Sequence, residues 1–78
     1  MRDDEVAGRP GTVVTRIRGG DLPGEVRVAI RGGTEDFIAY AEQEIERGET
    51  ILVFRSRGER AVDVIPYPEA DLVDPAGL

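Results

Sequence analysis

Four short segments of the chain have the residue pattern of β-strands, and stretches rich in Gly separate them. The clearest is "EVRVAIR", in which Val26, Val28 and Ile30 alternate with Arg or Ala. Successive side chains of a strand point to opposite faces of a sheet, so this pattern predicts a strand with one buried face. We expect an all-β fold with strands at Thr12–Arg18, Glu25–Arg31, Thr50–Arg55 and Arg60–Ile65.

Glycines mark the bends between these segments, because Gly adopts a positive φ without steric cost. We expect structural turns at Gly8, Gly11, Gly24, Gly48 and Gly58. The stretch "GRPG" that holds the first two could also be a phosphate-binding loop. It lacks the Lys-Ser/Thr pair of such loops, and a strand follows it where a helix N-terminus is required. We therefore interpret this stretch as a bend into the first strand.

The segment Thr34–Gly48, "TEDFIAYAEQEIERG", fits two structures. As a helix it would begin at Thr34, end at Gly48 and carry an apolar stripe that includes Phe37 and Ile45. As a strand, its first half would pair with the second strand, and the rest would be a connection that places Ile45 in the core. Residue propensity favours the helix, whereas topology favours the strand, because a fifth strand would let the sheet close into a small barrel.

The chain has 78 residues, which is enough for one domain, and it has no Cys to form a disulfide. Its stability must therefore come from an apolar core. We expect a flexible N-terminus over residues 1–5, a barrel over 6–66 and a flexible acidic tail over 67–78. The alternation predicts a core of Val13, Ile17, Val26, Val28, Ile30, Ile51, Val53, Val62 and Val64.

The composition restricts the chemistry that this chain can perform. It contains no His, Cys or Lys, which are the usual general bases, nucleophiles and transition-metal ligands. We therefore expect no catalytic site, no metal and no cofactor. The net charge of −6 disfavours nucleic acid and anionic lipid as partners unless the cations are clustered. No apolar run approaches the length of a membrane span, and the acidic N-terminus is unlike a signal peptide, so we expect a cytoplasmic location.

The order of these elements resembles the C-terminal domain of the NfeD-like family. The resemblance covers residues 8–66: a Gly-x-x-Gly bend, a strand with a central Thr, and a Gly before an alternating strand. An aromatic third strand, an Ile-x-x-Gly step, a Val-rich strand, a Gly hairpin and a Val-x-Val strand follow. The matching residues are Gly8, Gly11, Thr15, Gly24, Val26, Val28, Phe37–Ala41, Ile45, Gly48, Ile51, Val53, Gly58, Val62 and Val64.

This resemblance implies a five-stranded barrel of the OB type that binds a membrane scaffold protein of the stomatin or flotillin type. Family members usually carry the barrel after transmembrane helices, and some add a serine protease domain. This chain shows neither, so we expect a free-standing variant or a fragment, a monomer or weak homodimer, recruited to the membrane through its partner. The alternative function is an OB fold that binds single-stranded nucleic acid, which the few aromatic residues and the absence of Lys disfavour.

Arginines supply the candidate partner-binding residues. Arg16, Arg18, Arg27 and Arg31 are expected on the outward faces of two adjacent strands. They could pair with nearby carboxylates as a solvated surface, or they could accept an acidic partner.

Overall fold

The structure, a computed structural model, describes residues 6–67. The flexible ends expected at 1–5 and 68–78 lie outside the described residues. Tyr67, the first residue of the expected tail, is still bound to the barrel, because its backbone N–H donates to the Thr50 carbonyl at 3.0 Å. The described part contains the strands β1 (Pro10–Thr15), β2 (Gly24–Ile30), β3 (Gly33–Tyr40), β4 (Thr50–Gly58) and β5 (Ala61–Pro66). No helix in residues 6–67 is long and apolar enough to cross a membrane.

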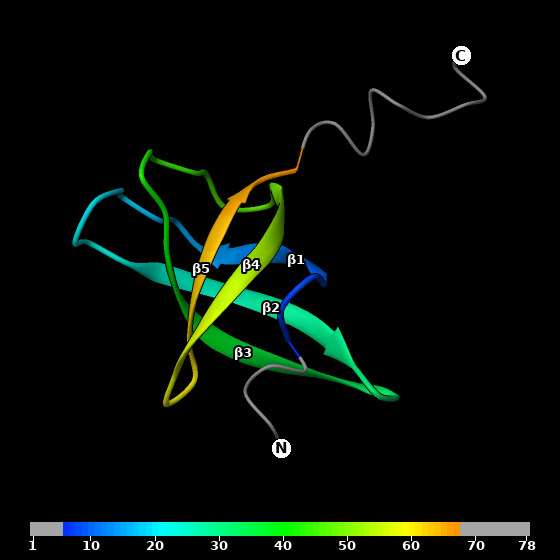
Figure 1. Ribbon diagram of the computed structural model, residues 1–78. Coiled ribbons are helices and arrows are strands. Elements are labelled where there is room, and N and C mark those ends of the chain that lie inside the picture. The colour runs from blue at the N-terminus through cyan, green and yellow to red at the C-terminus, as the bar shows by residue number, and fades with distance from the viewer. Residues whose placement is uncertain (1–5, 68–78) are drawn as a thin grey trace, which may run out of the picture.

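The five strands form a closed barrel in the order β1-β2-β3-β5-β4, and β4 returns to β1 (Figure 1). All neighbours are antiparallel except β3 and β5, which pair in parallel over three residues. This order and closure are those of the small OB-type barrel, which confirms the predicted fold. In Figure 1, β2 and β3 extend together to a turn that lies apart from the other strands.

The barrel interior is filled by aliphatic side chains. Every residue predicted for the core is buried, which confirms the period-two interpretation. The core also contains Val6, Phe37, Ala39 and Ile45. Contiguous burial of this kind provides the main stabilising free energy of a domain without disulfides.

The segment that fitted two structures is a strand as far as Tyr40, and the helix interpretation of this segment is wrong. Residues 33–39 pair with all of β2, which buries Phe37 and Ala39. The rest of the segment is a connection that places Ile45 in the core, where its backbone exchanges two 2.9 Å hydrogen bonds with Ile17. Pairing with two neighbouring strands outweighs the local helix propensity of the Glu-rich sequence.

The first strand is shorter than predicted and carries a bulge. The pairing of β1 with β2 shifts register between Val13 and Thr15, so one extra residue lies in β1. Thr15 is therefore exposed, and its hydroxyl donates to Glu25 at 2.9 Å instead of pointing into the barrel. The bulge disturbs the ladder locally, and Ile17 beyond it is still buried as the alternation predicts.

Two of the five predicted glycine turns are wrong. Gly8, Gly48 and Gly58 have φ values of 88°, 93° and 83°, which suit turns. Gly11 and Gly24 instead lie within β1 and β2. A Cβ would lie 2.7 Å from the Arg27 carbonyl oxygen at Gly11 and 2.2 Å from that of Thr15 at Gly24. These two positions require Gly because two backbones approach closely.

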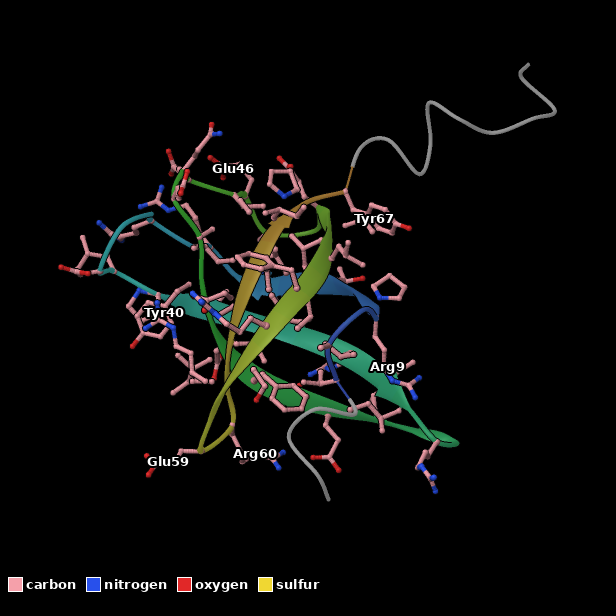
Figure 2. All side chains as sticks on the ribbon, viewed as in Figure 1. Arg9, Tyr40, Glu46, Glu59, Arg60 and Tyr67 are labelled. Atoms are coloured by element: carbon pink, nitrogen blue, oxygen red, sulfur yellow. The ribbon has the colours of Figure 1, made fainter. Side chains whose placement is uncertain are left out.

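Both hairpin turns of the barrel use residues with positive φ. Arg31 and Gly32 form the turn between β2 and β3, with φ values of 48° and 83°. Glu59 and Arg60 form the turn between β4 and β5, with φ values of 55° and 62°, and Figure 2 shows both at the tip of that hairpin. Positive φ at both central residues is the requirement of the two-residue hairpin turn that matches strand twist.

Candidate binding site

A cluster of charged side chains lies on the outside of the barrel where β3, β5 and β4 are neighbours. At its centre is Asp63 of β5, which is 5% exposed although it is charged. The Nε atoms of Arg55 and Arg57 in β4 each donate to Asp63 at 2.9 Å, the first to Oδ2 and the second to Oδ1. The Arg57 Nη2 atom also lies 2.9 Å from Oδ1. Both oxygens of the buried carboxylate therefore have partners, as burial of a charge requires.

The backbone of β4 brings both arginines to the same carboxylate. Its pairing with β5 shifts register between Val53 and Arg55 and again between Ser56 and Gly58. Arg55 is thereby placed directly opposite Asp63. The strand also continues to Gly58, beyond the predicted end at Arg55, so Arg57 lies in the strand and not in a loop.

Tyr40 completes the cluster from the third strand. Its backbone is the parallel partner of Asp63, and Figure 2 labels its side chain on the outside of the barrel. The Arg57 guanidinium lies over the Tyr40 ring at 3.9 Å from the centroid. A planar guanidinium in this position gains cation–π attraction while it bonds the carboxylate with its edge.

The environment shifts the pKa values of Asp63 and Arg57. Burial raises the pKa of Asp63, but the hydrogen bonds from Arg57 and Arg55 and the charges of both arginines together lower it by more. The pKa of Asp63 is therefore below its usual value. The hydrogen bond to Asp63 raises the pKa of Arg57. Asp63 and Arg57 therefore remain charged at neutral pH, which makes them a fixed ion pair and a poor source or acceptor of protons.

A groove of about 410 Å³ lies over this cluster. β5 pairs with β3 only as far as Asp63, and beyond that point the chain of β3 turns away into the loop to β4. The groove occupies the space between that loop and the end of β5. Its lining is Gly20, Asp21, Tyr40–Gln43, Phe54, Arg55, Arg57 and Asp63–Pro66. Two of these are large apolar side chains that face solvent, since Phe54 is 50% and Ile65 44% exposed.

The structure does not bring the predicted binding arginines together. Only Arg27 lies within a strand; Arg16 and Arg18 follow the end of β1, and Arg31 lies in the β2–β3 turn. The prediction that all four project from two adjacent strands is therefore wrong, because β1 ends at Thr15 and the tight turn begins at Arg31. Arg16 forms an ion pair with Glu44 at 3.2 Å and Arg27 with Asp36 at 2.8 Å.

Sequence reasoning missed the groove cluster, although a signal for it exists. Asp63 lies between two buried valines in "VDV", and Arg55 and Arg57 alternate in the preceding segment "FRSR". An acidic residue in one strand and two arginines in its hairpin neighbour are suited to cross-strand ion pairs. Within residues 6–67, no three acidic side chains gather in a way that could hold a metal ion.

Comparisons with known proteins give a matching family and similar solved structures. The sequence pattern of the NfeD C-terminal domain matches residues 10–65. The soluble domain of the NfeD protein YuaF from Bacillus subtilis is 34% identical, with a TM-score of 0.71 over 85% of this chain and 79% of that one. The C-terminal domain of stomatin operon partner protein 1510-C from Pyrococcus horikoshii is 26% identical, with a TM-score of 0.67 over 86% of this chain and 95% of that one. A search of curated protein sequences gives no match.

Proposed function

This chain belongs to the NfeD C-terminal domain family, and from that membership we propose that it is a non-catalytic module that binds a membrane scaffold protein of the stomatin type. The observation that carries the proposal is the likeness to the C-terminal domain of a protein named as a stomatin operon partner. That likeness extends over most of both chains, and the operon relation to stomatin in that name is the reason for proposing a stomatin-type partner for this chain.

The residue content and the candidate site support binding over catalysis. No His, Cys or Lys is available anywhere in the sequence to act as base or nucleophile. Asp63 is the one buried carboxylate among the described residues, and two arginines keep it ionised. A carboxylate held in that state is a weak proton acceptor, whereas fixed charges on a rigid sheet suit recognition of another protein.

The proposal includes a location. A stomatin-type partner is a membrane protein, so the chain would be held at the cytoplasmic surface of a membrane through that contact. We do not assign the contact to the four arginines of the sequence prediction as a single surface. They remain a candidate set for an acidic partner, spread along the length of β2 and beyond the end of β1.

Capture of a purified partner tests the proposed function. The full chain is immobilised, and a detergent-solubilised stomatin-type protein from the same organism is passed over it at low salt. We expect saturable binding that weakens as the salt concentration rises, because charged surfaces contribute to association. A single-stranded oligonucleotide serves as the comparison ligand. Retention of the oligonucleotide but not of the stomatin-type protein would refute the proposal.

A further inference from the structure

The groove over Asp63 contains a guanidinium that is held in place but only partly used. The Nε atom of Arg55 donates to Asp63, and among the described residues its two terminal nitrogens make no hydrogen bond. Its side chain is 67% exposed, whereas that of Asp63 is 7% exposed. The buried carboxylate therefore fixes the direction of Arg55, and the outer edge of the guanidinium remains open to a ligand.

The open edge of a guanidinium has a specific chemical preference. Two parallel N–H groups match the two oxygens of a carboxylate, which gives a charge-assisted pair of hydrogen bonds. Because Asp63 already orders Arg55, binding such a carboxylate would cost less side-chain entropy than binding to a mobile surface arginine.

The apolar residues of the groove define what must accompany that carboxylate. Phe54 is next to Arg55 in the chain, its ring centroid lies 5.8 Å from the Arg55 guanidinium, and the residue is half exposed. Ile65 supplies a second exposed apolar side chain to the same groove. A ligand with apolar side chains beside its carboxylate would cover both and remove apolar surface from water.

The acidic residues of the groove exclude one class of ligand. Asp21 and Glu42 also line it, and Asp21 is close enough to affect the pKa of Arg57. A ligand with many negative charges would be repelled by these carboxylates. The site thus suits a single carboxylate flanked by apolar groups, and it does not suit a polyanion.

We infer that the groove between the β3–β4 loop and β5 docks an extended peptide segment of a partner protein that presents one acidic side chain between apolar ones. Its carboxylate pairs with the outer edge of Arg55, and its apolar neighbours lie against Phe54 and Ile65. This inference builds on the proposed protein-binding function and adds the surface and the chemistry of the partner segment.

A titration with three synthetic peptides tests this inference. The peptides share capped Gly-Ser flanks and differ only in the centre, which is Leu-Asp-Leu, Leu-Asn-Leu or Asp-Asp-Asp. Each is added to the isotope-labelled full chain at low salt, up to millimolar concentration, and followed by nuclear magnetic resonance. We expect Leu-Asp-Leu to shift the signals of Phe54, Ile65 and the Arg55 side chain. It should bind about tenfold more tightly than Leu-Asn-Leu, equivalent to about 1.4 kcal/mol.

Variants of the chain provide matched controls. Arg55→Gln should lower the affinity for Leu-Asp-Leu to that of Leu-Asn-Leu, whereas Arg47→Gln, at an exposed arginine outside the groove lining, should leave it unchanged. Phe54→Ser should weaken binding, and Leu22→Ser, at a more exposed apolar residue outside the lining, should not. The spectrum of each free variant shows whether it is folded. The comparison of Leu-Asp-Leu with Leu-Asn-Leu tests the contact with Arg55 on the unaltered chain.

The outcomes separate this inference from the proposed function. Equal binding of Leu-Asp-Leu and Leu-Asn-Leu, stronger binding of Asp-Asp-Asp, shifts outside the groove, or no shifts would each overturn it. The titration contains no stomatin-type protein, so its failure leaves the proposed partner standing. Conversely, failure to capture a stomatin-type protein would leave a positive titration as support for the groove with a different partner.

Discussion

Arg–Asp pairs join neighbouring strands in both hairpins of this barrel, one pair to Asp36 and two to Asp63, and the two carboxylates differ in burial. Arg27 of β2 donates to Asp36 of β3 through Nε at 2.8 Å and Nη2 at 3.1 Å, with both side chains about half exposed. Asp63 of β5 is almost fully covered and bonds two arginines. The Arg27–Asp36 pair contributes little to the free energy of unfolding despite its two hydrogen bonds, because water competes for both side chains. Asp63 itself is almost covered although Arg55 and Arg57 are 67% and 45% exposed, so the loss of both arginines would leave a buried carboxylate without partners.

The two hairpins also differ in how their turns meet the demand for positive φ. The β2–β3 turn uses Arg31 and Gly32, whereas the β4–β5 turn uses Glu59 and Arg60 without Gly. A non-Gly residue in the left-handed region is strained. The hairpin with the buried ion pair therefore carries the more strained turn, which predicts different responses to substitution.

The largest expected effect comes from the close backbone approach in the β2–β3 hairpin and not from its Arg27–Asp36 ion pair. Gly24→Ala should lower the free energy of unfolding by about 3 kcal/mol, because the new Cβ would overlap the backbone carbonyls of Thr15 and Arg16. Chemical denaturation followed by circular dichroism measures the change. Gly33→Ala, at the other end of the same hairpin, is the control, since a Cβ there meets open space. Equal stability of the two variants would contradict the close-approach explanation for Gly24.

A smaller effect tests burial directly. Asp63→Asn should lower the free energy of unfolding by about 2 kcal/mol, since hydrogen bonds from two charged donors are weakened in a covered site. Asp36→Asn makes the same chemical change in the exposed pair, and we expect it to alter stability little. Thermal and urea unfolding of both variants check the difference. Similar losses in the two variants would show that burial does not distinguish the pairs.

The turns should respond in opposite directions. Gly32→Ala should destabilise the chain by about 1 kcal/mol, because Ala would adopt a positive φ there. Glu59→Asn should stabilise it by about 0.5 kcal/mol, since Asn tolerates this conformation better than Glu. Melting temperatures give the sign of each change. A destabilised Glu59→Asn variant would mean that strain in this turn is not the dominant cost.

The smallest expected effect is a difference in acid sensitivity. The hydrogen bond from Arg27 lowers the pKa of Asp36, and the two arginines hold that of Asp63 low despite burial. A carboxylate with a lowered folded-state pKa stabilises the fold above its unfolded pKa of about 4, and this stabilisation is lost as the pH falls through the folded pKa. Each Asp→Asn variant should therefore lose stability less steeply than the parent below about pH 4.

A high salt concentration should distinguish the contribution of Asp36 to the acid sensitivity from that of Asp63. At about 1 M salt the Debye length is near 3 Å, so the exposed Arg27–Asp36 pair is screened and the covered Asp63 is screened less. Stability against pH at low and high salt, for the parent and both variants, measures this. We expect high salt to remove the difference between the parent and Asp36→Asn, but not that between the parent and Asp63→Asn. If high salt removed the difference for Asp63→Asn and not for Asp36→Asn, the proposed difference in burial between the two carboxylates would be contradicted.

Most of the barrel could be predicted from local pattern. The alternation of Val26, Val28 and Ile30 identified a strand and its buried face, and the predicted core residues are all inside. The groove could not be predicted in the same way. Its formation depends on register shifts in β4 and on where β3 leaves β5, and neither leaves a mark in the alternation itself. The expected arginine surface failed because β1 ends at Thr15, before Arg16 and Arg18, and the β2–β3 turn begins at Arg31.

The sequence by itself determined the fold class, the core and the limits on chemistry, because side-chain alternation and composition are properties of a few neighbouring residues. The tertiary structure decided three things: that residues 33–40 are a strand, that Gly24 is required by a crowded backbone and not by a turn, and that Asp63 is buried and bonded by Arg55 and Arg57. Each of these depends on how neighbouring strands pair and how closely they approach, and not on the alternation within one strand. Burial and pairing are set by the neighbours that the closed barrel supplies, and the free energy of those contacts overrides local preference.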